Sequence, residues 1–445
     1  MQESFCKTRL SRCLCVLMGA LVLGMLWRFR GTHGWGSESG ILNSGFIFTM
    51  FLVIITGGNA RTNPFRIALN SFLFILTTPA WGTLLNQMRG MISSGPDPIY
   101  YGVSPASGVF MMLMLGFSIA GLFGIMTGFM FSDSKLKAWH YVLLVAALYA
   151  VTYLFKAGPA HQIIRLVQPQ TIDHFNSSLV ANGVDCGVFK AYMSHFDNME
   201  WGRSIIGGRN YVAEVGTISL AVATMVCILL TRFVIKDRRA ARIGLLTALS
   251  FAFAITFANL FFVFFSDTGK PALIESQRIF AWGCWEYFTG FIAGALVTLI
   301  VIKLGTCDNR RDDSADFIPL RMRNFLGFAG TMAVLCYNII RPIILRYEKG
   351  TLQHPAIVAA ITIAVLAVAI YGVRSRFDVS RMDGVRFSKV TLLWLVLLQS
   401  VIYFFGDDKI YLSVGELDNF CTLISCIPVL VLDYLLVRKQ FKVLK

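Results

Sequence analysis

Long apolar runs separated by short polar segments dominate the pattern of this 445-residue chain. Most runs are about 15 to 25 residues long, which suits helices crossing a hydrocarbon core about 30 Å thick. No run shows the two-residue alternation of a barrel strand, and backbone polar groups must pair internally in lipid, so helices are predicted. About twelve such runs are present. They occupy residues 13–27, 41–57, 67–85, 107–131, 140–157, 211–235, 244–266, 279–302, 324–341, 355–373, 389–405 and 418–437.

The composition supports the same fold class. Apolar residues make up 56% of the chain and charged residues only 15%, more apolar surface than a soluble protein can bury. We therefore predict an all-α, polytopic integral membrane helix bundle. Its two six-helix halves would comprise residues 1–235, with an external loop at 158–210, and residues 236–445.

A weak similarity between the second and eighth runs allows the two halves to be parallel repeats. Trp35-Gly36 precedes the Gly-Phe-Ile of residues 45–47, and Trp282-Gly283 precedes the Gly-Phe-Ile of residues 290–292. Six-plus-six repeats occur in transporters. Chance similarity between glycine- and phenylalanine-rich segments is the alternative explanation.

The distribution of basic residues predicts the orientation. Lys and Arg are concentrated in the loops on the same side of the membrane as the N-terminus. The positive-inside rule therefore places both termini in the cytoplasm. We expect a multi-pass protein of the cell membrane, which is the inner membrane of a cell envelope. The net charge of +15 would suggest nucleic acid in a soluble chain. Here no basic stretch interleaves with aromatic residues, so no nucleic-acid partner is expected. The cysteines and histidines show no tight ligand spacing, and no cofactor motif is present, so neither a metal nor a cofactor is expected.

The segment 28–45, between the first two runs, carries the main candidate site. It contains Arg28, Arg30, His33, Trp35 and Glu38 among five glycines. The arginines, expected just outside the first helix, suit a phosphate or a carboxylate, and the histidine suits proton transfer near neutral pH. The alternative is a re-entrant cap in which Arg28 or Arg30 neutralises Glu38 or Glu286.

Glu286 and Glu214 are carboxylates inside apolar runs, where a charge suggests function by default. Glu286 lies in the eighth run, and its spacing from Glu275, Arg278 and Trp282 puts all four on one helical face if the helix begins at Glu275. Glu214 lies about one turn inside the sixth run. The alternatives are a structural ion pair for the first carboxylate and an interfacial position for the second.

Two further patterns predict local structure. Residues 160–167 form an amphipathic stretch in the external loop, with His161 and Arg165 one turn apart, suited to the membrane surface. The fourth run carries a stripe of small residues that favours close helix contact. These residues are Gly116, Gly121, Gly124 and Gly128.

Two main functions fit these patterns. One is proton-coupled secondary transport of a polar or anionic solute or lipid head group. Its substrate-binding residues would be Arg28, Arg30, His33, Trp35, Glu38, Arg278 and Trp282, and its proton-coupling residues Glu286, Glu214 and His33. The other is a membrane transferase acting at the outer face on a lipid-linked or cell-envelope substrate, with His33 or Glu286 as general base. A structural or assembly role is a third option, so enzyme activity stays open. The expected partners are membrane lipids and an anionic or lipid-linked small substrate.

Overall fold

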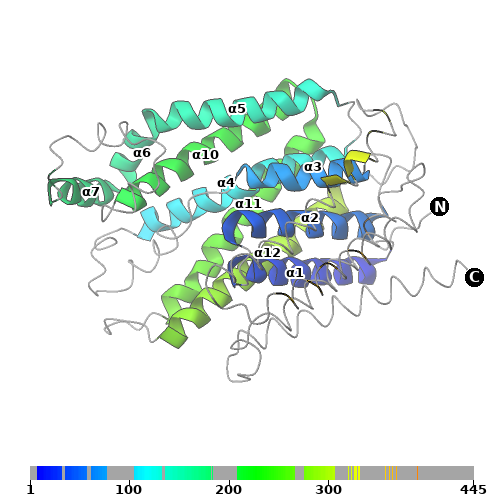
Figure 1. Cartoon of the computed structure of the whole chain (residues 1–445), viewed down its shortest axis with the longest axis horizontal. Coiled ribbons are helices and arrows are strands. Elements are labelled where there is room, and N and C mark those ends of the chain that lie inside the picture. The colour runs from blue at the N-terminus through cyan, green and yellow to red at the C-terminus, as the bar shows by residue number, and fades with distance from the viewer. Residues whose placement is uncertain are drawn as a thin grey trace, which may run out of the picture. The chain divides into compact units, whose positions relative to one another are not determined.

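The computed structural model describes residues 8–32, 36–57, 62–77, 105–132, 136–181, 183, 208–265 and 275–305, with scattered positions between 319 and 388. Within these ranges every regular element is a helix (Figure 1). The helices are α1 (Arg9–Thr32), α2 (Gly36–Thr56), α3 (Pro64–Ile75), α4 (Pro105–Met130), α5 (Ala138–Lys156), α6 (Pro159–Val167), α7 (Pro169–Ala181), α10 (Gly208–Phe233), α11 (Arg238–Phe265) and α12 (Glu275–Leu304).

Several of these helices are long and apolar enough to cross a membrane, which indicates a membrane protein and agrees with the predicted all-α class. Among the described residues there are six, within α1, α4, α5, α10, α11 and α12. A shorter apolar helix, Ser44–Thr56, lies within α2. The last four expected spans fall largely outside the described residues, so the total of about twelve stays a prediction.

The segment between the first two spans differs from the prediction. The apolar run 13–27 was expected to bound the first helix, but α1 continues to Thr32 and α2 already begins at Gly36. The segment 28–45 is therefore helical at 28–32 and 36–45, and residues 33–35 lie outside the described residues. The reason is that hydropathy marks the apolar centre of a helix, whereas the backbone hydrogen bonds continue through polar residues until something interrupts them.

The chain divides into two compact units that are not consecutive in sequence. The first comprises Met1–Leu76, Phe123–Ala138 and Gly290–Lys445, and the second comprises Thr77–Leu122 and Trp139–Thr289. Of the four boundaries, one falls just after α3, one within α4, one after the first residue of α5 and one within α12. The sequence-based halves and the repeat stay predictions.

In the first unit, α1, α2 and α3 lie side by side (Figure 1). Buried polar side chains link these helices. The Asn70 side-chain nitrogen donates to the hydroxyl oxygens of Thr49 at 3.2 Å and Thr127 at 3.1 Å, and the Ser44 hydroxyl donates to the Leu26 carbonyl at 3.3 Å. Such bonds hold helices together where lipid supplies no hydrophobic driving force between them.

Glycines allow α12 to approach α1 closely in the same unit. A Cβ atom at Gly290 would overlap the Leu23 carbonyl oxygen and lie 2.6 Å from the Trp27 Cβ. A Cβ atom at Gly294 would overlap the Gly19 carbonyl oxygen. These two glycines are four residues apart, the small-residue spacing typical of close crossings in membranes.

Glycines of α4 serve the same purpose in the second unit. A Cβ atom at Gly116 would meet the backbone of Phe251 and Ala252 in α11, and one at Gly121 would meet the Thr224 side chain in α10. The prediction of close helix contact is confirmed at these two positions.

Candidate functional site

Two short helices lie in the stretch that the sequence indicated as a long external loop. The α6 helix packs against α7 and the start of α10 (Figure 1). Each short helix begins with a proline, Pro159 and Pro169, and proline suits the first helical position because it needs no amide hydrogen there. The amphipathic helix predicted at 160–167 is therefore confirmed as a helix, and α7 was not predicted.

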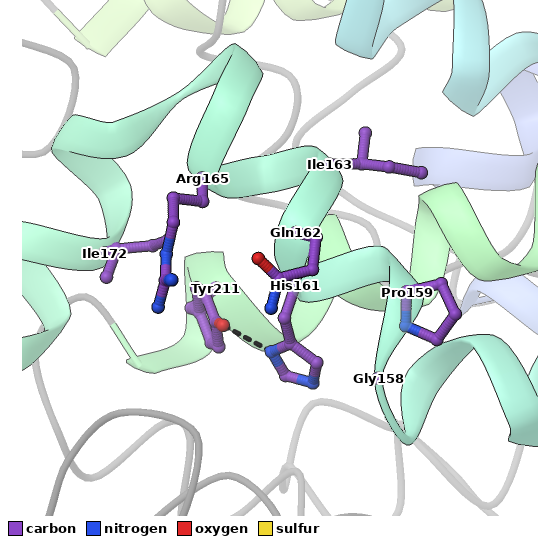
Figure 2. Close-up of a pocket in the computed structure, with 8 residues that line it drawn as sticks. All are labelled: Gly158, Pro159, His161, Gln162, Ile163, Arg165, Ile172 and Tyr211. Carbon is purple, nitrogen blue, oxygen red and sulfur yellow. Dashed lines mark hydrogen bonds between the residues drawn. The ribbon is translucent and has the colours of Figure 1, made fainter.

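A buried histidine on α6 connects three elements. The His161 Nδ1 atom forms a hydrogen bond with the Tyr211 hydroxyl, at the start of α10, and its Nε2 atom lies 2.9 Å from the Lys156 carbonyl oxygen, at the end of α5 (Figure 2). A carbonyl can only accept, so Nε2 carries the proton and Nδ1 accepts the hydroxyl hydrogen. Both ring nitrogens are thus engaged.

This environment favours the neutral imidazole. His161 is only 4% exposed. Burial lowers its pKa below the ordinary value of 6.5, against a smaller raising effect from the hydrogen bond to Lys156. His161 therefore acts as a neutral hydrogen-bonding bridge near pH 7.

Tyr211, the first residue of the candidate span Tyr211–Phe233, connects His161 to the membrane helix α10. Its ring stacks on Phe175 of α7 at 5.2 Å between centroids. Glu214 lies one turn further along α10, and Arg165, on α6, lines the same cavity as Tyr211. Tyr211 therefore connects α6 and α7 to the first turn of the span that contains Glu214.

A cavity of about 730 Å³ opens beside this pair. Such a volume is in the usual range for a small-molecule site. In Figure 2 the guanidinium of Arg165 lies alongside the Tyr211 ring, and the Ile163 side chain points away from both. The cavity lining consists of Gly158, Pro159, His161, Gln162, Ile163, Arg165, Ile172 and Tyr211.

Two fully buried carboxylates form a second group of candidate residues. Glu214 and Glu286 are both 0% exposed. Each is the fourth residue of a candidate span, Tyr211–Phe233 and Gly283–Leu304, about 5 Å along the helix axis from the first. Both predicted proton-coupling carboxylates therefore lie inside the protein, one turn from a span end.

Asn259 of α11 adds a third buried polar residue to this group. It lies two residues before Phe261, whose ring stacks on Phe288, two residues after Glu286, at 4.7 Å between centroids. If α10, α11 and α12 cross the membrane in succession, their directions alternate. The start of α10, the end of α11 and the start of α12 then share one side of the bilayer.

The remaining predicted site residues have different outcomes. Arg28 and Arg30 were expected just outside the first helix, but both lie within α1, a correction that follows from the longer helix, and Arg28 is only 6% exposed. The backbones of Arg30, Glu38, Arg278 and Trp282 are helical, and their side chains lie outside the described part. His33 and Trp35 also lie outside it. The α12 helix begins at Glu275, as the prediction of one shared face requires. The helical backbone therefore places four residues at spacings that share a face: Glu275, Arg278, Trp282 and Glu286.

Sequence reasoning missed Tyr211 and a buried polar pair in α3. The Arg66 guanidinium donates to the Phe129 carbonyl at 3.2 Å, one turn from the Asn70 network described above. Their spacing of four residues was a readable signal, because a basic and an amide side chain on one face of an apolar helix need partners. A tyrosine at the start of a span carries no such signal.

Comparison of the chain with known protein families, with curated proteins and with solved structures found no match.

Proposed function

We propose that this protein is a secondary transporter that couples the movement of a polar or anionic solute, or a lipid head group, to protons. The observation that supports this proposal is the complete burial of Glu214 and Glu286, each about one turn inside a candidate membrane span. A carboxylate in such a position costs free energy because its charge is removed from water, and in membrane proteins such residues occur mainly on substrate and proton pathways.

The proposed mechanism assigns roles to both kinds of charge. Glu286 and Glu214, with His33, exchange a proton, and Arg28, Arg30 and Arg278 attract the anion. A solute that binds one conformation more tightly shifts the population between outward-open and inward-open states. Loading a carboxylate with a proton removes a buried charge, and this makes the conformational change easier in the loaded state.

A proton-flux measurement tests this mechanism. The full chain is reconstituted into liposomes containing the pH dye pyranine at symmetric pH 7, and lactate, glycerol phosphate or inorganic phosphate is added outside. At least one solute should acidify the lumen with the native chain. Glu286→Gln and Glu214→Gln should lower the initial rate at least about tenfold, as expected for lost transition-state contributions above 1.4 kcal/mol.

An exposed carboxylate supplies the matched control. Asp173→Asn on α7 removes an acidic group outside the membrane spans and should leave the rate unchanged. Normal acidification with both glutamine variants would rule out the proposed coupling residues. Acidification lost in Asp173→Asn as well would point to a general charge effect.

A membrane transferase is the second candidate, and the cavity on α6 favours it. The cavity lies where α5 ends and α10 begins, a depth that a lipid-linked substrate can reach from the bilayer. In this alternative His33 or Glu286 is the general base, Glu214 holds helices together, and Glu214→Gln affects stability. Radiolabelled acyl or glycosyl transfer to an added lipid acceptor by the purified chain would support it.

A further inference from the structure

The depth of the α6 cavity can be placed from the two spans beside it. The candidate span Ala138–Lys156 ends two residues before Gly158, and the span Tyr211–Phe233 begins at a lining residue. The cavity therefore lies at the end of two spans, beyond the hydrocarbon core. Lipid phosphate groups occupy this depth.

The exposed face of α5 supports this placement. Trp139 lies exposed near one end of the helix, Tyr153 lies exposed near the other end, and Tyr149 lies exposed one turn further in. Between them the face is apolar, with Val142 exposed. Amphipathic aromatic rings concentrate at the two membrane–water boundaries, so Tyr153 marks the boundary next to the cavity.

The polar lining suits an oxyanion. Arg165 is exposed on the cavity wall, and its planar guanidinium matches phosphate geometry. Burial keeps His161 neutral, so the positive charge of the lining comes from Arg165. Gln162 adds an amide donor (Figure 2).

The remaining surface suits an apolar body attached to that oxyanion. Pro159, Ile163 and Ile172 line the cavity, and Leu166, next to Arg165 in α6, is 84% exposed. A free phosphate ion needs neither this apolar lining nor a cavity of about 730 Å³. A glycerophospholipid uses both.

We propose that the cavity formed by α6, α7 and the start of α10 is a binding site for the phosphate group of a membrane lipid, with Arg165 as its cationic partner. This site does not depend on the proposed transport. The lipid binds there whether it is carried, modified or retained as a fixed part of the protein.

Native mass spectrometry of the full chain in a maltoside detergent tests the site. Dioleoyl phosphatidate should bind at least tenfold more tightly than dioleoylglycerol, which has the same chains and no phosphate. Arg165→Gln should weaken phosphatidate binding about tenfold or more, since a charge-assisted contact is lost. Arg165→Lys should lose less, because it keeps the charge without the fork.

Two further variants serve as a control for charge and as an independent test of the cavity. Arg238→Gln removes an exposed arginine beyond the opposite end of α10 and should bind phosphatidate like the native chain. Ile172→Trp fills the cavity without changing charge and should weaken binding of phosphatidate even if Arg165→Gln fails to fold. Each variant is checked for an unchanged melting temperature.

Three results would overturn the proposal. Equal affinity for dioleoylglycerol would show that the phosphate is not recognised. Displacement of phosphatidate by an equal concentration of inorganic phosphate would show a site for the free ion rather than a lipid. Equal losses in Arg165→Gln and Arg238→Gln would show unspecific attraction of an anionic lipid.

Discussion

At the scale of single residues, Tyr211 of α10 links four helices through direct contacts and through His161: α5, α6, α7 and α10. Its hydroxyl bonds to His161 of α6, whose other nitrogen reaches the Lys156 carbonyl at the end of α5, and its ring stacks on Phe175 of α7. Glu214 follows one turn later on the same helix. A substitution of Tyr211 should therefore alter the packing of α6 and α7 and the surroundings of the buried Glu214.

The neutral state of His161 predicts a pH-dependent stability. Its pKa is lowered in the folded protein, so below pH 6.5 the unfolded chain binds a proton that the folded chain does not yet bind. The stabilising contribution is therefore complete above pH 6.5 and decreases as the pH falls through the lower folded value.

The measurement compares the melting temperature of the native chain with that of His161→Gln, in detergent, from pH 8 to pH 5. The glutamine variant should melt lower at pH 8, because it loses the ring bridge. This difference should narrow toward pH 5, since only the native chain has the imidazole to protonate. A difference that stays constant or widens would contradict the assignment.

The sequence predicts some individual residues well and others poorly, for physical reasons. A carboxylate well inside an apolar run needs a polar partner within the protein, so the burial of Glu286 could be anticipated, whereas for Glu214 an interfacial position was equally open. The position of Arg28 could not, because a helix end depends on hydrogen bonds rather than on hydropathy. The pairing of His161 with Tyr211 spans 50 residues and needs the tertiary fold.

At the scale of helices, close glycine contacts determine which surfaces can meet. The crossing of α1 and α12 uses Gly290 and Gly294, where the partner backbone occupies the space of a side chain. Gly216 in α10 has open space at the same atom. The chain therefore contains its own control for the effect of replacing a helical glycine.

We predict opposite outcomes for alanine at these positions. Gly290→Ala and Gly294→Ala should destabilise the protein by about 1–3 kcal/mol, because the added methyl group overpacks a close crossing. Gly216→Ala should be neutral or stabilising by up to about 1 kcal/mol, since alanine has the higher helix propensity. Thermal unfolding of the purified full-chain variants in detergent measures both, and equal effects would contradict the close crossing.

Helix starts are a second feature of this scale that local sequence specifies. Asn63 caps α3 by accepting from the Arg66 amide at 3.1 Å, and Asp237 caps α11 by accepting from the Ala240 amide at 2.8 Å. Such caps follow known preferences. The α7 helix was missed although Ile172, Phe175 and Leu179 repeat at helical spacing after Pro169, because its polar residues resemble a loop.

At the scale of the whole molecule, the described helices establish the fold class, and the topology across a membrane stays a prediction. The two contact-based units interleave along the chain, with the first containing residues from both ends. Contacts and sequence repeats describe different properties, so these units do not test a six-plus-six duplication. The orientation can be tested directly, and it determines which side of the membrane the α6 cavity faces.

The positive-inside rule predicts that both termini are cytoplasmic and that residues 158–210 are external. Two reporters with opposite requirements check this prediction in a bacterial inner membrane. A fluorescent protein fused after Lys445 should fluoresce, because it matures in the cytoplasm. Alkaline phosphatase inserted at Gly183 should be active, because it needs the oxidising exterior.

Gly183 suits the insertion because it is exposed, has a positive φ of 72° and has open space around it. Exchanging the two reporters supplies the control, and both exchanged fusions should then be silent. Activity only in the exchanged fusions would reverse the orientation. The phosphate site proposed at Arg165 would then face the cytoplasmic leaflet, and protons would have to reach Glu214 and Glu286 from inside the cell.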